Sequence, residues 1–101
     1  MPLWTRLKVE LDRAGQMAQI AIDEGRVRLE AFRARQQADK AAAALGYAVA
    51  QARREAREIE ADVLKRLSDA LDAAETTAAA QEKRLAELVS ARKASRRSST
   101  W

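Results

Sequence analysis

The sequence predicts an all-α protein, and three observations lead to this prediction. Ala, Arg, Leu and Glu are the commonest residues, with Ala at 24 of 101 positions, and all four are strong helix formers. Residues that interrupt helices are scarce, with one Pro and three Gly. No segment alternates between apolar and polar residues as a half-buried strand does. This composition is typical of long helices that pack in a coiled-coil-like manner.

Residues 1–24 are predicted to form an amphipathic N-terminal helix. Pro2 suits a first helical turn, where its missing N–H costs nothing. At 100° per residue the large apolar side chains gather on one side, whereas Arg6, Asp12 and Arg13 lie away from it. We expect this face to contact either a protein or a lipid surface. Its large residues are Leu3, Trp4, Leu7, Leu11 and Ile22.

A second apolar stripe, rotated by about 160° from the first, follows residues 25–93. Its spacings of three and four residues predict a long Ala-rich helix. Glu24/Arg28 and Arg35/Asp39 have the i,i+4 spacing that supports such a helix. We expect the stripe to form a helix-packing interface, made by Val27, Leu45, Val49, Ala52, Ala56, Ile59, Val63, Leu67, Leu85 and Leu88.

Two architectures fit this stripe. In the favoured one, the chain bends near Gly25 and then forms one helix over residues 25–93, roughly 100 Å long at 1.5 Å per residue. The stripe keeps its phase past Gly46, which indicates a helix that runs through this glycine. The alternative is an antiparallel two-helix hairpin that turns near Gly46, with arms of nearly equal length. The residues around Gly46 lack the polar side chains common in turns, which argues against the hairpin.

Residues 94–101 are predicted to be a disordered basic tail. Basic and acidic residues balance over positions 1–90, so four basic residues near the end account for the net charge of +4. These residues could contact phosphate groups or an anionic membrane, and phosphorylation of the neighbouring serines would reverse the charge. A solubilising terminus is the simpler interpretation. The four are Arg92, Lys93, Arg96 and Arg97.

The residue types present argue against catalysis. The chain has no His and no Cys, so the usual ligands of zinc and copper and the usual general base near neutral pH are missing. We therefore expect no catalytic residue, cofactor or metal. Sequence-specific nucleic-acid binding is not expected either, because Glu55 and Glu58 interrupt the cluster of Arg53, Arg54 and Arg57.

The predicted function is that of a non-enzymatic structural or interaction protein. Only 24 residues are apolar and larger than Ala, too few for an ordinary compact core, so we expect the chain to self-associate or to dock as an elongated subunit on another helical protein. The alternative is a peripheral membrane protein anchored on an anionic surface by residues 3–22. No uncharged run approaches the roughly 20 residues of a membrane span. The predicted location is therefore the cytoplasm of a bacterium, at the membrane periphery if the alternative holds.

Overall fold

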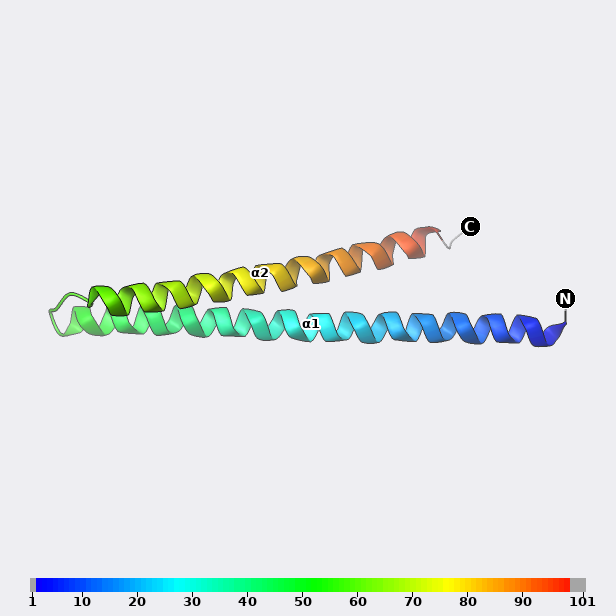
Figure 1. Cartoon of the computed structure of the whole chain (residues 1–101), viewed down its shortest axis with the longest axis horizontal. Coiled ribbons are helices and arrows are strands. Elements are labelled where there is room, and N and C mark those ends of the chain that lie inside the picture. The colour runs from blue at the N-terminus through cyan, green and yellow to red at the C-terminus, as the bar shows by residue number, and fades with distance from the viewer. Residues whose placement is uncertain (1, 99–101) are drawn as a thin grey trace.

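The chain folds into two long helices that lie side by side in opposite directions (Figure 1). The computed structural model describes residues 2–98, with α1 over Leu3–Arg54 and α2 over Ala61–Ser98. The molecule measures 81 × 21 × 18 Å and has a radius of gyration of 23.0 Å, far above the roughly 13 Å of a compact domain of this length. The predicted all-α class is confirmed, and the architecture is an elongated helical hairpin.

The favoured architecture of one helix over residues 25–93 is wrong. Gly25 and Gly46 both lie inside α1, and the chain reverses over residues 55–60. The hairpin alternative therefore has the right architecture with its turn in the wrong place. The stripe misled the prediction because an apolar row with constant phase fits one straight helix and two folded-back helices equally well.

The end of α1 explains why the turn carries no obvious sequence signal. Ala56 has a φ of 54°, in the left-handed region, where glycine is the usual residue. The N–H of Ala56 donates to the carbonyl of Arg53 (3.1 Å) and that of Arg57 to the carbonyl of Ala52 (3.0 Å). These two bonds make a Schellman motif, which closes the helix and satisfies its last carbonyl groups. Because alanine stands at the glycine position, the sequence does not mark this helix end.

The seam is the row of residues along which α1 and α2 pack. On α1 it advances by alternating steps of three and four residues, and Val27, Ala31, Ala38 and Ala52 are its buried members. The row is completed by the buried Glu24 and the half-buried Ala34, Ala41, Leu45 and Ala48. On α2 Ala78 is buried, and the half-buried members are Val63, Leu67, Leu71, Ala74, Gln81, Leu85 and Leu88.

Three residues predicted to pack in this interface lie outside the seam, and one of them, Ile59, is half-buried in the segment between the two helices. Val49 is 45% exposed, because the seam of α1 passes from Leu45 to Ala48 and Ala52 and leaves Val49 on one side. Ala56 is exposed in the turn, where its left-handed backbone ends α1.

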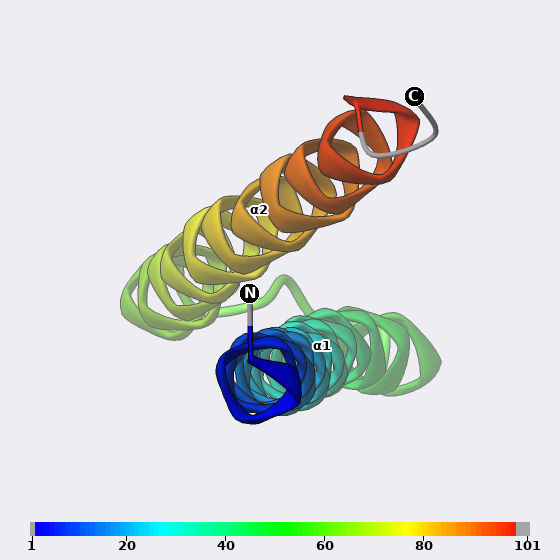
Figure 2. The ribbon, with the colours of Figure 1, turned by 90° about the vertical axis from the view of Figure 1, so that its right-hand side faces the viewer.

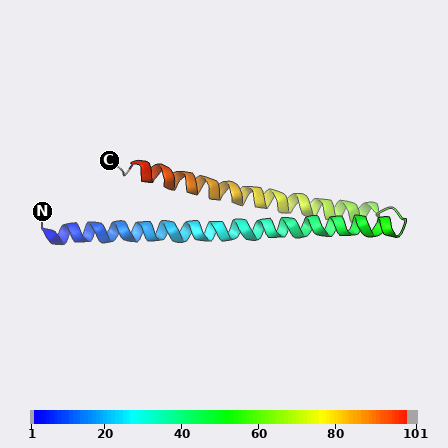
Figure 3. The same cartoon turned by 180° about the vertical axis from the view of Figure 1, so that it is seen from behind.

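The two helices differ in length, so α1 extends beyond the end of α2 (Figures 1 and 3). We call residues 3–22 the arm. All of its side chains are exposed except that of Thr5, which is half-buried. Viewed nearly along α1, the C-terminal end of α2 diverges from it (Figure 2). Within residues 2–98, no second helix therefore packs along the arm.

The predicted disordered tail is partly helical, since α2 continues to Ser98. Arg96 and Arg97 lie in its last turn, where positive charge interacts favourably with the helix dipole. Residues 99–101 lie outside the described part of the chain. Over residues 2–98, neither helix contains an apolar stretch long enough to cross a membrane.

Candidate helix-docking surface

The apolar face of the arm points away from α2. Leu7 precedes the buried Val27 by 20 residues, which places the two side chains about 160° apart around α1. The same face continues to Leu29 and Phe32, and these residues are 47% and 60% exposed although α2 runs beside this part of α1. Helix α1 therefore has two apolar faces on nearly opposite sides, and α2 covers only one of them.

The large side chains on the arm are among the most exposed apolar groups of the described residues. Leu3 and Trp4 are 81% and 74% exposed, and Leu7, Leu11 and Ile22 range from 48% to 64%. Contiguous apolar surface of this kind usually marks a binding site in a soluble protein. All five residues of the predicted N-terminal apolar face thus lie on one unpartnered helix.

The arm face also has a regular repeat and a gradient of side-chain size. It advances by alternating steps of three and four residues, as the rows of packed helices do. Large side chains occupy its first half and small ones its second. In order, the members of the arm face are Trp4, Leu7, Leu11, Ala14, Ala18 and Ala21.

A buried carboxylate marks the point where the arm leaves the hairpin. Glu24 is only 8% exposed. Its Oε1 lies 3.3 Å from Nη2 of Arg28 and its Oε2 lies 3.4 Å from Nη1 of Arg92. The first contact is the predicted i,i+4 pair. The second joins α1 to the end of α2, so Arg92, one of the four predicted tail residues, takes part in holding the hairpin together.

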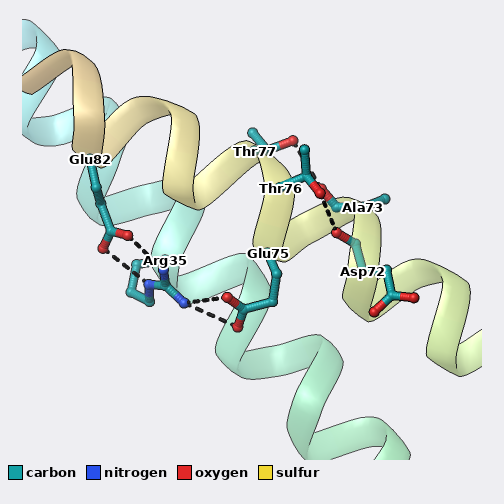
Figure 4. A network of polar contacts seen from close by, with 7 residues as sticks. All are labelled: Arg35, Asp72, Ala73, Glu75, Thr76, Thr77 and Glu82. Carbon is teal, nitrogen blue, oxygen red and sulfur yellow. Dashed lines mark hydrogen bonds and ion pairs between the residues drawn. The ribbon is translucent and has the colours of Figure 1, made fainter.

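A second polar cluster fixes how the two helices align (Figure 4). Arg35 donates from Nε and Nη2 to Glu82, at 3.1 and 2.6 Å, and from Nη1 to Glu75, at 2.9 and 3.0 Å. These hydrogen bonds hold the pKa of Glu82 below its usual value and raise that of Arg35. The predicted partner of Arg35 was Asp39, but the guanidinium reaches across to α2 instead.

A shallow pocket lies beside the turn, with a volume of about 360 Å³. Ile59 and Val63, both predicted to pack between helices, line it together with Tyr47 and Gln51. Arg54 stacks over the ring of Tyr47 at 5.9 Å from its centroid. The pocket is open to solvent, so we assign it no ligand.

The described residues contain no group of three or more acidic side chains placed to hold a metal ion. Several carboxylates are instead paired with arginine or lysine, as in Glu30 with Arg84 at 3.6 Å and Asp69 with Lys65 at 2.6 Å.

Comparison of the chain with protein-family models, with curated proteins and with solved structures gives no match.

The structure brings most of the predicted interface residues into the seam. Val27 and Ala52 are buried there, and Leu45, Val63, Leu67, Leu85 and Leu88 are half-buried. The buried Ala78 and the half-buried Leu71 were not among the residues assigned to the interface. Counting strict steps of three and four from Val27 would have found the seam residues of α1.

The seam row of α2 contains one polar residue, Gln81. The Oε1 atom of Gln81 is buried and has no hydrogen-bond partner among the described residues. Such a group costs free energy that a hydrogen bond would recover.

The remaining predicted tail residues are exposed on the last turns of α2. They are Lys93, Arg96 and Arg97.

Proposed function

We propose that this chain is a non-enzymatic helical interaction protein. Its two helices form an antiparallel coiled coil, and the arm is the surface that docks on a helical partner. One observation carries the proposal: the apolar face of the arm, led by Trp4, Leu7 and Leu11, is exposed and points away from α2. An amphipathic helix is stable mainly when its apolar face is packed, so a partner on this face would stabilise the arm.

The small core of the hairpin supports the same proposal. Among the described residues the buried apolar side chains are Val27 and four alanines. Burial of alanine contributes little, whereas a buried aromatic side chain removes about 150–250 Å² from water. Packing a partner against Trp4 and the arm leucines would therefore add apolar contact that the hairpin itself lacks.

The mass of the native assembly tests this function. The tagged full chain is expressed in its own organism, and the isolated assembly is weighed by native mass spectrometry. We expect a mass above that of one chain, which falls to that of one chain in Leu7→Asp. Val9→Asp is the matched control, because Val9 is equally exposed (49% against 48% for Leu7) but points to the other side of α1. An assembly that Leu7→Asp leaves intact would refute the docking role of the arm.

A peripheral membrane protein is the second candidate, and the exposed Trp4 near the tip of the arm favours it, since Trp prefers membrane interfaces. The arm has three basic and two acidic residues, which gives little attraction to anionic lipid. Flotation with anionic and neutral vesicles at about 0.15 M salt separates the two candidates. Flotation that is lost in Trp4→Ala would support the membrane role, and absence of flotation would support the protein partner.

A further inference from the structure

We infer that the partner of the arm is the arm of a second copy of this chain, packed antiparallel to the first. The inference rests on the proposed docking function and names its partner. Its basis is the gradient of side-chain size along the arm face, which is large from Trp4 to Leu11 and small from Ala14 to Ala21. A surface with such a gradient is complementary to itself when one copy is turned end to end.

The complementarity appears layer by layer. An antiparallel register that sets Leu11 level with Ala14 of the second copy also sets Leu7 level with its Ala18 and Trp4 level with its Ala21. Each of these three layers then combines one large and one small side chain, while Leu3 and Ile22, which are also level in this register, form a layer of two large side chains at the end of the row. The distance between helix axes depends on the side chains in contact, so it stays constant along this pairing, and the layers can interdigitate at normal packing density.

A parallel pairing lacks this property. It would place Trp4 against Trp4 and Leu7 against Leu7, followed by layers of alanine alone. The axes would have to lie far apart at the start of the arm and close together at Ala18. Two straight helices cannot satisfy both distances without a void or a clash.

The seam of the hairpin also combines small side chains on one helix with larger side chains on the other. There α1 contributes mainly alanine, such as Ala31, Ala38 and Ala52, and α2 contributes the larger Leu67 and Leu85. Helix α1 thus packs a small-residue row against larger side chains on one side, and the arm offers the same combination on the other.

Neither the charges nor the rest of the fold oppose this pairing. In the same register Arg6 is level with Gln19 of the second copy, and Lys8 with its Met17, so no like charges face each other. The arm face points away from α2, as its exposure and the helical spacing from Val27 indicate. The C-terminal end of α2 diverges from α1 (Figures 1 and 2). The α2 helices of both copies therefore lie on the outer sides of the paired arms.

Analytical ultracentrifugation of the purified full chain tests whether the partner is a second copy of this chain. We expect a dimer at micromolar concentrations, and in Leu7→Asp an apparent dissociation constant raised at least hundredfold, because two interior leucines per dimer are replaced by charges. Val9→Asp should change it less than threefold. Helix content by circular dichroism should agree between the two variants when both are monomeric.

Cysteine cross-linking tests the orientation, since the chain has no native cysteine. We expect Leu7→Cys and Ala18→Cys to form a disulfide with each other when mixed. Neither should cross-link alone, because residue 7 and residue 7 of the second copy lie 11 residues apart along the axis, roughly 16 Å. Val9→Cys mixed with Gln16→Cys is the control, level in the same register but on the far side of α1. This pair should not cross-link.

Other results of these experiments would overturn the antiparallel orientation, the second copy as partner, or the docking function itself. Cross-links of residue 7 with itself and of residue 18 with itself would overturn the antiparallel orientation. A purified monomer whose native assembly is still lost in Leu7→Asp would overturn the second copy as partner and leave the docking function standing. A purified monomer whose native assembly survives Leu7→Asp would overturn both.

Discussion

Arg35 in α1 holds Glu82 in α2 through two hydrogen bonds, with Nη2 2.6 Å from Oε1 and Nε 3.1 Å from Oε2. The two residues are 47 positions apart in the chain. The same guanidinium bonds Glu75, which lies two helical turns from Glu82 on the same helix. A guanidinium held between two carboxylates has one position along α2, so this cluster selects the alignment of the hairpin.

Replacing Arg35 should weaken the hairpin. We expect Arg35→Gln to lower the midpoint of thermal unfolding by a few degrees at low salt, and the difference should shrink at high salt because these groups are solvent-exposed and screened. Circular dichroism measures the midpoint. Arg33→Gln, an exposed position on the same helix, is the control. Equal midpoints for the two variants would show that the cluster contributes nothing to stability.

Acid should remove the contribution of Glu82. Its pKa in the folded state lies below the ordinary value of 4.5, chiefly because of the hydrogen bonds from Arg35. A carboxylate with a lowered folded pKa stabilises the fold above its unfolded pKa, and the effect disappears as the pH falls through the folded pKa. We therefore expect the wild-type midpoint to fall on acidification more than that of Glu82→Gln. In Arg35→Gln, carboxyl carbon shifts measured by NMR should report a Glu82 pKa close to the ordinary value.

The turn should accept glycine at position 56. Ala56 has a φ of 54°, which costs a residue with a Cβ about 1 kcal/mol and glycine almost nothing. We expect Ala56→Gly to raise the free energy of unfolding by about 0.5–1 kcal/mol, measured by urea denaturation. Ala50→Gly, inside α1, should lower it by about 1 kcal/mol. A loss of stability in both variants would contradict the left-handed turn.

Gly46 should accept alanine. It lies within α1, its φ is not positive, and a Cβ built there meets nothing within 4 Å. Gly46→Ala should therefore stabilise the fold by about 0.5–1 kcal/mol, since alanine is the better helix former. The same urea measurement checks this. A destabilised Gly46→Ala would instead support a turn at this glycine.

The polar seam residue offers a further test. Because the Oε1 atom of Gln81 is buried without a partner among residues 2–98, we expect Gln81→Leu to raise the free energy of unfolding by about 1–2 kcal/mol. Gln37→Leu, at an exposed position of α1, should change it by less than about 0.5 kcal/mol. Destabilisation by Gln81→Leu would mean that the amide makes a bond worth more than the apolar contact.

Some features of this structure could be predicted from the sequence, and others could not. The N-terminal apolar face, from Leu3 to Ile22, was predicted from its helical spacing, and the structure has all of its residues on one helix. Val49 was misplaced because its spacing fits a helix, although the seam follows Ala48. The partners of Arg35 could not be predicted, because they lie 40 and 47 positions away and Asp39 offered a local alternative.

The sequence by itself determined that this chain is helical and that it carries two apolar stripes about 160° apart, since both properties follow from residue propensities and from spacing along a helix of 3.6 residues per turn. Only the tertiary structure decided where the chain turns and which face α2 covers. The turn depends on a left-handed backbone conformation at Ala56, a position where the sequence has no glycine to indicate it. The choice of face depends on contacts between residues far apart in the chain, where the seam and the Arg35 cluster must form together. The covered face packs against α2, and the face of the arm on the other side of α1 is exposed.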